Sequence, residues 1–243
     1  MDKGSSMFAN KRPIRRMPTH RSAPSAPYVD APNAGRVLVA ISSCELYENN
    51  GYNQSLRDTW LPILQQYGWD YKFFHGKKGT TRGDIVALDC EDPYFDLTSK
   101  TKKKLEWSYQ HGYDFTFCCF PDTYPCVERL VKCGYENFDY FGNVFQHAGG
   151  TPFCQGGAGY FLSRKANFII TTDFRNYPNE DCFVGDLLNR SDIKRGDCKA
   201  FCYAGPGPLR SNDTVTNHLS TQDGGFTGAA VLREHSNWKD SWV

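Results

Sequence analysis

Two acidic residues, Glu180 and Asp181, come directly before the apolar helix pattern that runs to Leu188. A carboxylate at the edge of a cleft can take the proton of a hydroxyl and so make it a nucleophile. Acids are also favoured at a helix start for a simpler reason, since the helix N-terminus carries partial positive charge. The spacing by itself leaves both interpretations open.

Polar residues also follow the two most apolar segments of the chain. Ser42 and Ser43 end the run Val37–Ile41, and Pro121-Asp122 follows the run Phe115–Phe120. Continuous apolar runs of this length are typical of strands that are buried on both faces of a parallel sheet. Ligands of such folds bind at the carboxyl ends of the strands. We therefore expect these polar groups to face a crevice.

Strand and helix patterns alternate along the first half of the body of the chain. Beyond the two apolar runs, strands are expected at Asp70–Gly76 and Ile85–Leu88, with a strand running into a helix over Phe161–Lys165. Helices are expected at Gln54–Tyr67, with an end or kink at Pro62, at Ser99–His111 and from Cys126 to Cys133. This alternation predicts an α/β fold with a mostly parallel central sheet and flanking helices.

The charge balance is close to neutral, with 28 Lys and Arg against 27 Asp and Glu. It is uneven along the chain, because residues 1–36 carry seven basic and two acidic side chains, a net charge of +5. Residues 1–35 are rich in Pro, Ser, Ala and Arg without apolar periodicity, which predicts a disordered basic tail. The tail is either a solubilising extension or an arm that binds an anionic surface such as nucleic acid or a membrane.

The ten cysteines admit three interpretations: free thiols, disulfides or a structural zinc site. A chain of 243 residues does not need disulfides to build a core, and the cysteine spacings lack paired C-x-x-C steps. The first 30 residues have no apolar stretch of the secretory type, and no apolar run is long enough for a membrane span. These features favour free thiols and a cytoplasmic protein without a transmembrane segment.

Seven segments, in this order, resemble motifs of the β-1,3-glycosyltransferase superfamily, which includes the Fringe and β-1,3-galactosyltransferase enzymes. They are SLRDTW at 55–60, YKFFHG at 71–76, DPYFDLTSKT at 92–101, DTY at 122–124, QGGAGYFLSRK at 155–165, EDCFVG at 180–185 and TVTNH at 214–218. Each motif alone is weak, but the shared order and spacing make the resemblance specific. It covers residues 36 to about 220.

The resemblance implies a GT-A-like fold over residues 36–243, with a nucleotide-sugar half at 36–135 and an acceptor half at 136–243. It implies an inverting glycosyltransferase that moves a sugar from a nucleotide donor, expected to be UDP-linked, to a hydroxyl of a glycan or glycoprotein acceptor. Asp181 matches the catalytic general base. The positions that match the nucleotide-sugar side are Arg57, Asp92, Lys100, Asp122, Gly156 and Gly157.

One departure from the family pattern concerns the metal. The family usually has three acids in a row, where this chain has Phe120-Pro121-Asp122. Asp122 and His218 match metal ligands, which implies a Mn²⁺ ion, or Mg²⁺ as the alternative, with low affinity for the free ion because only one carboxylate is left. A helix-capping role for Asp122, an ordinary loop histidine at His218, and a metal-independent enzyme stay open.

Two other functions are therefore kept. The reduced aspartate cluster also suits a non-catalytic relative that binds a nucleotide or carbohydrate. The +5 tail also suits a transferase that acts on nucleic acid, because attraction to phosphates is independent of sequence. A cytoplasmic member of this family would suggest a viral or microbial setting, and the alternative is a soluble fragment of a Golgi-lumen enzyme.

Overall fold

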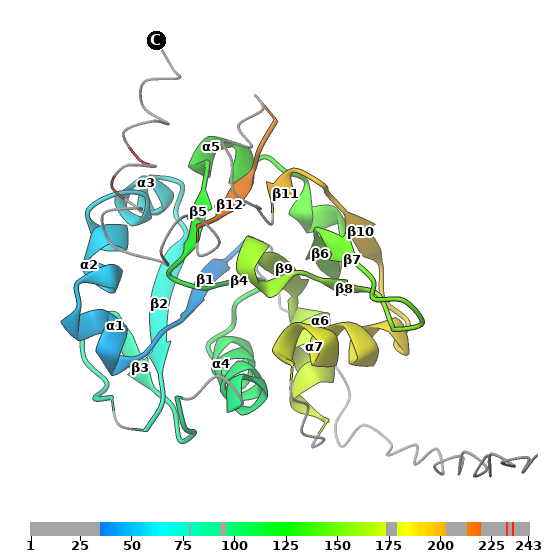
Figure 1. Ribbon diagram of the computed structural model, residues 1–243, viewed down its shortest axis with the longest axis horizontal. Helices are drawn as coiled ribbons and strands as arrows, with labels where there is room; N and C mark the ends of the chain where they lie inside the picture. The colour runs from blue at the N-terminus through cyan, green and yellow to red at the C-terminus, as the bar shows by residue number, and fades with distance from the viewer. Residues whose placement is uncertain are drawn as a thin grey trace, which may run out of the picture.

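The computed structural model describes residues 35–77, 79–92, 96–173, 179–202 and 213–219, together with Leu232 and His235. The expected tail at 1–35 thus lies outside the described residues except for Gly35. Figure 1 shows the described part as a central sheet with helices on both of its faces.

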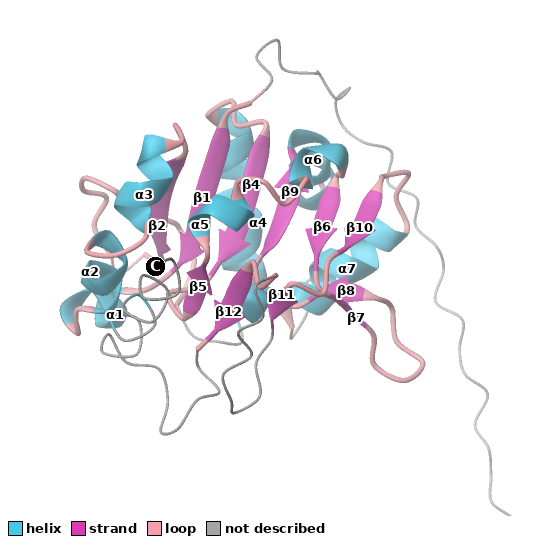
Figure 2. Ribbon diagram, turned by 90° about the horizontal axis from the view of Figure 1, so that it is seen from above, coloured by secondary structure: helices cyan, strands magenta, loops and turns pink. Residues whose placement is uncertain are grey.

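The central sheet has seven strands in the order β10-β6-β9-β4-β1-β2-β3, and Figure 2 shows most of them side by side. All described neighbours in this sheet pair in parallel except β9, which is antiparallel to both β4 and β6. The strands are β1 Val37–Ser42, β2 Asp70–His75, β3 Ile85–Ala87, β4 Phe115–Cys119, β6 Tyr140–Gly142, β9 Tyr160–Ser163 and β10 Arg195–Asp197. The predicted mixed α/β fold with a mostly parallel sheet is confirmed.

Two smaller sheets lie beside the central one. The first joins β11 Phe201–Cys202, β12 Thr216–His218 and β5 Thr123–Pro125 in that order. The second is the antiparallel pair β7 Val144–Phe145 and β8 Phe153–Cys154. Strands from both predicted halves of the chain enter the central sheet, because β6, β9 and β10 follow residue 136.

Helices pack on the two faces of the central sheet. In Figure 1, α4 (Leu97–Gln110), α6 (Arg164–Thr171) and α7 (Glu180–Asn189) lie on one face. The short helices α1 Glu45–Asn49, α2 Tyr52–Arg57, α3 Leu61–Gln66 and α5 Val127–Leu130 complete the set, with 3-10 turns at Tyr135–Asn137 and Gly156–Ala158. No helix in the described residues combines the length and apolar character needed to cross a membrane.

The central position of strand β1 in the sheet explains why the run Val37–Ile41 is continuously apolar. All six of its residues are buried, because its backbone pairs with β2 on one side and β4 on the other. Val39 and Ile41 pack into one core cluster together with Trp60, whereas Leu38 and Ala40 pack into another on the opposite face. A central strand between two helical layers has no face left for polar side chains.

Local signals explain several helix boundaries. The expected helix at 54–67 is two helices, and Pro62 lies in the first turn of α3, where its missing N–H costs nothing. Ser163 begins α6 by accepting a hydrogen bond from the Ala166 N–H at 3.2 Å. All ten cysteines are free thiols, as the sequence favoured.

Candidate functional site

A cavity of about 410 Å³ opens at the carboxyl ends of β1 and β4. Its lining residues are Ser42, Ser43, Cys44, Tyr47, Asp92, Leu97, Lys100, Phe120, Asp122, Gly156, Gly157, Glu180, Asp181 and His218. From β1 the chain continues to β2 on one side, while β4 lies on the other side. The cavity therefore lies at a topological switch point of the sheet, the usual ligand site of such folds, and the crevice expected beside Ser42, Ser43 and Asp122 is present.

The cavity brings together seven of the eight residues predicted for the site. Asp92, Lys100, Asp122, Gly156, Gly157, Asp181 and His218 all line it. They come from five stretches of the chain, the most distant of which are separated by more than a hundred residues. A volume of this size suits a small organic ligand.

Arg57 is the predicted residue that the structure does not place in the cavity. Its guanidinium pairs with Glu48 at 3.0 Å and with Asp84 at 2.8 Å. Burial lowers the pKa of Arg57, but the Asp84 and Glu48 carboxylates outweigh burial and raise it. Because its guanidinium pairs with both carboxylates, Arg57 links α2 to α1 and to the turn before β3.

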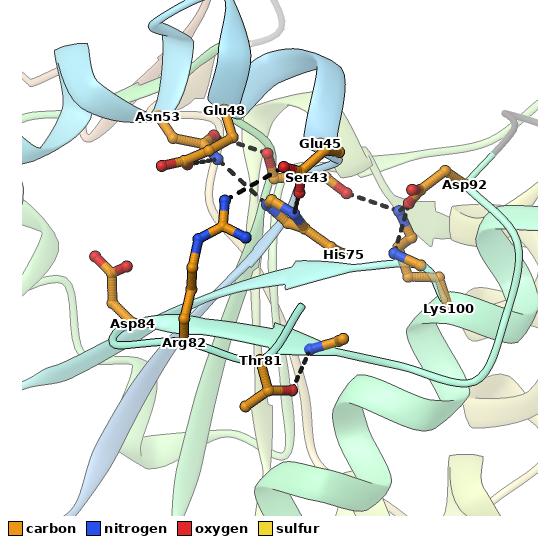
Figure 3. A network of polar contacts seen from close by, with 12 residues as sticks. Ser43, Glu45, Glu48, Asn53, His75, Thr81, Arg82, Asp84, Asp92 and Lys100 are labelled. Carbon is orange, nitrogen blue, oxygen red and sulfur yellow. Dashed lines mark hydrogen bonds and ion pairs between the residues drawn. The ribbon is translucent and has the colours of Figure 1, made fainter. Parts of the chain in front are cut away.

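A chain of polar contacts leads from Glu48, one of the two partners of Arg57, to the cavity wall, and Figure 3 shows it from Glu48 onward. Glu48 accepts a hydrogen bond from Asn53 Nδ2 at 2.8 Å, and Asn53 Oδ1 accepts one from Ser43 Oγ at 2.7 Å. His75 is fully buried beside Asn53, and burial lowers the pKa of its imidazole. These contacts connect Arg57 with the segment that carries Ser43.

The buried Lys100 and the half-buried Asp92 form an ion pair at one wall of the cavity (Figure 3). The Lys100 side chain is only 2% exposed, and its ammonium also donates to the Ser43 carbonyl at 2.7 Å. Asp92 accepts a second hydrogen bond from the Gly76 N–H at 2.7 Å. A side chain at Gly76 would collide with the Cys90 carbonyl and with Asp92 itself, so this close approach requires glycine.

Asp122 and His218 meet at another wall. His218 Nε2 lies 3.1 Å from Asp122 Oδ2, although the two residues are 96 positions apart. Pairing of β12 with β5 sets His218 opposite Thr123, the residue after Asp122. Asp122 Oδ1 is buried and makes no hydrogen bond within the described residues, so it is an acceptor available to a ligand or cation.

Glycines bring the backbone close to these side chains. An added Cβ at Gly157 would lie 2.6 Å from the His218 ring, and one at Gly156 would lie 3.2 Å from Glu180 Oε2. The Gly156 N–H donates to Asp181 Oδ2 at 3.4 Å, and the Cys182 N–H donates to Asp181 Oδ1 at 2.8 Å. Backbone N–H groups thus orient the Asp181 carboxylate at the N-terminus of α7.

Three residues without a predicted role lie at or behind the cavity: Tyr47, Lys104 and Glu180. Burial raises the pKa of Tyr47, and Cys44 and Asp122 raise it further. Lys104 follows Lys100 at a spacing of four on the same helix, so a helical projection would have placed both ammonium groups on one face. The resemblance to the family motif assigns a role to Asp181 and none to the preceding Glu180.

No family model matches the sequence. Among solved structures, the crystal structure of A197 from STIV is similar to this chain with a TM-score of 0.39 and 13% sequence identity, over 66% of this chain and 80% of that chain. A similarity of this size carries no argument about fold family or activity. The fold and the cavity define a mixed α/β protein whose candidate site, at the switch point of its sheet, is lined by four acidic residues.

Proposed function

We propose that this protein is an inverting glycosyltransferase of the GT-A-like type, which moves a sugar from a UDP-linked donor to a hydroxyl of a glycan or glycoprotein. The observation that carries the proposal is the assembly of Asp92, Lys100, Asp122, Asp181 and His218 around one cavity. Each of these residues also matches a position of the family motifs in the sequence. Their convergence at a switch point supports a shared role in one ligand site.

Asp181 acts as the general base in this proposal. An acceptor hydroxyl is a weak nucleophile near neutral pH, so a carboxylate must take its proton as it attacks the anomeric carbon. The hydroxyl oxygen forms the new glycosidic bond while the bond to the diphosphate breaks, and the diphosphate leaves with that electron pair. The backbone N–H groups of Gly156 and Cys182 hold the Asp181 carboxylate toward the cavity.

In this proposal a divalent cation has two protein ligands, Asp122 and His218, and its other ligands come from the diphosphate of the donor. Within the described ranges, no group of three or more His, Cys, Asp and Glu side chains is placed to hold a metal. The buried, unbonded Asp122 Oδ1 is a hard oxygen ligand, and imidazole is also acceptable to Mn²⁺. Mn²⁺, or Mg²⁺, would be held by Asp122 and His218, and would supply positive charge to the leaving diphosphate.

Gly157→Ala tests this pair. The new methyl group would lie 2.6 Å from the His218 imidazole, so the ring or the backbone at residue 157 must shift and the contact between His218 and Asp122 is disturbed. Calorimetry with and without Mn²⁺ gives the factor by which the ion raises the affinity for UDP. We expect this factor to be at least about tenfold smaller in the variant than in the wild-type protein. Gly150→Ala, in an exposed loop, is the matched control and should behave like the wild-type protein. Equal Mn²⁺ effects in all three proteins would contradict the role of His218.

A donor screen tests the proposed function as a whole. Thermal shift and calorimetry with UDP, UDP-glucose, UDP-galactose and UDP-N-acetylglucosamine, each with and without Mn²⁺, should identify at least one donor that binds. Mass spectrometry should then detect free UDP and a transferred or hydrolysed sugar. If none of these compounds binds, the proposal is contradicted.

The single carboxylate left at Phe120-Pro121-Asp122 favours a second candidate, a non-catalytic protein that binds a nucleotide or carbohydrate. The same screen separates the two. Binding of a nucleotide sugar without release of UDP over a day, across a panel of glycan acceptors, would support the binding protein. Release of UDP supports the enzyme.

A further inference from the structure

A buried lysine and a buried glutamate lie at the back of the cavity on two neighbouring helices. Lys104 of α4 is 1% exposed and Glu180 of α7 is 6% exposed. The Lys104 ammonium donates a hydrogen bond to Ser42 Oγ at 2.7 Å, and its charge also acts on the Glu180 carboxyl. A buried ammonium is costly unless an opposite charge balances it, so the pair favours an ionised Glu180.

The two oxygens of Glu180 have different surroundings. Oε1 accepts hydrogen bonds from the Tyr160 hydroxyl and from Thr101 Oγ1, the latter at 3.1 Å. Oε2 makes no hydrogen bond to any residue that the structure describes, and it lies beside Gly156 on the wall of the cavity. One oxygen is therefore fixed by the protein, and the other is presented to whatever fills the cavity.

Charged and titratable groups face this carboxyl from three elements. Burial raises the pKa of Glu180, Lys104 of α4 opposes that effect, and the adjacent Asp181 of α7 adds to it. The hydrogen bonds from Tyr160 of β9 and from Thr101 lower the pKa, and the net direction is upward. The Glu180 carboxyl therefore takes up a proton at a higher pH than an ordinary glutamate does.

We propose that Glu180 is a specificity residue that recognises a hydroxyl of the transferred sugar, with Oε2 accepting its hydrogen bond and Lys104 keeping the carboxylate charged. An ionised carboxylate is an acceptor only, so it suits a sugar hydroxyl and repels a phosphate. The inference rests on the proposed function, because it assumes a nucleotide sugar in the cavity. Lys104 is a positioning residue, since it acts on the ligand through Glu180.

Glu180→Gln tests the recognition of the sugar. Calorimetry would compare UDP with UDP-glucose, UDP-galactose and UDP-N-acetylglucosamine. The wild-type protein should bind one of the sugar nucleotides more tightly than UDP. The variant should lose about 10- to 100-fold of that preference, the usual value of a hydrogen bond to a charged group, with UDP affinity unchanged. Glu128→Gln, an acid of α5 outside the cavity, is the control.

A deoxy series gives a second measurement that does not depend on how the variant folds. Wild-type protein should lose the same factor when one hydroxyl of the preferred sugar is removed, and Glu180→Gln should be insensitive to that change. Equal weakening of UDP and sugar nucleotide by Glu180→Gln, or no weakening of either, would overturn the proposal. Absence of UDP binding by the wild-type protein would overturn the proposed function as well, so the two failures are distinguishable.

The pH profile of sugar-nucleotide binding tests Lys104. Removing the ammonium in Lys104→Met raises the pKa of Glu180 further, so the affinity should begin to fall at a higher pH as the solution is acidified. Lys103→Met, on the same helix, should keep the wild-type profile. A profile that is the same in Lys104→Met and wild-type protein would overturn the role of Lys104.

Discussion

Asp181→Asn is expected to reduce sugar transfer about 10²- to 10⁴-fold, the usual contribution of a general base. The amide has nearly the same shape and can still accept a hydrogen bond from the Cys182 N–H through its oxygen. It does not take a proton from the acceptor hydroxyl, however. UDP and donor affinity, measured by calorimetry, and the melting temperature should stay close to the wild-type values.

The control for this experiment lies on the same helix. Asp186 pairs with Arg190 at 2.7 Å and accepts a hydrogen bond from Thr151, outside the cavity. Asp186→Asn should therefore keep full transfer activity. Normal turnover by Asp181→Asn would show that another group takes the proton and would remove Asp181 from the mechanism.

Lys100→Met is expected to destabilise the protein by about 3 kcal/mol and to remove nucleotide binding. Its ammonium is 2% exposed and joins Asp92 to the Ser43 carbonyl at the end of β1. Without it a largely buried carboxylate lacks its partner, which typically costs about 3–5 kcal/mol. The lower end applies because the Asp92 side chain is 22% exposed. Urea unfolding measures the loss of stability.

Binding of UDP to folded Lys100→Met, well below the unfolding transition, separates the two effects. The cavity would carry an additional uncompensated negative charge at Asp92, which repels a diphosphate. Lys103→Met, on the same helix but outside the cavity lining, controls for the loss of a positive charge and should change neither measurement by much. A Lys100→Met protein with wild-type stability and UDP affinity would show that the ion pair contributes to neither.

Seven of the eight predicted site residues line the cavity, and Arg57 does not. Its position in an R-x-T-W motif suggested the nucleotide side, but in the fold Glu48 and Asp84 engage its guanidinium. Asp84 lies 27 residues away, in the turn before β3. Local sequence around Arg57 carries no signal for such a distant partner, because strand pairing brings that turn to the helix.

Lys104 and Glu180 are the opposite case, because they lie at or behind the cavity although local sequence does not predict it. A lysine among Lys102 and Lys103 on a polar stretch of helix is expected at the surface, yet Lys104 is buried because α4 packs against the sheet at the end of β1. The packing of α7 next to α4 then places Glu180 within range of its charge. Helical periodicity can give the side of α4 on which Lys104 lies, but not the element that covers it.

The sequence by itself determined the α/β alternation, the buried character of β1 and β4, and the polar residues that follow them. These features depend on periodicities of a few residues, which burial between helical layers imposes directly. The tertiary structure alone decided that His218 lies against Asp122, that Arg57 lies outside the cavity, and that Lys104 lies behind Ser42. Those contacts depend on the order of strands in the sheet and on glycine positions such as Gly157, where distant parts of the backbone approach closely.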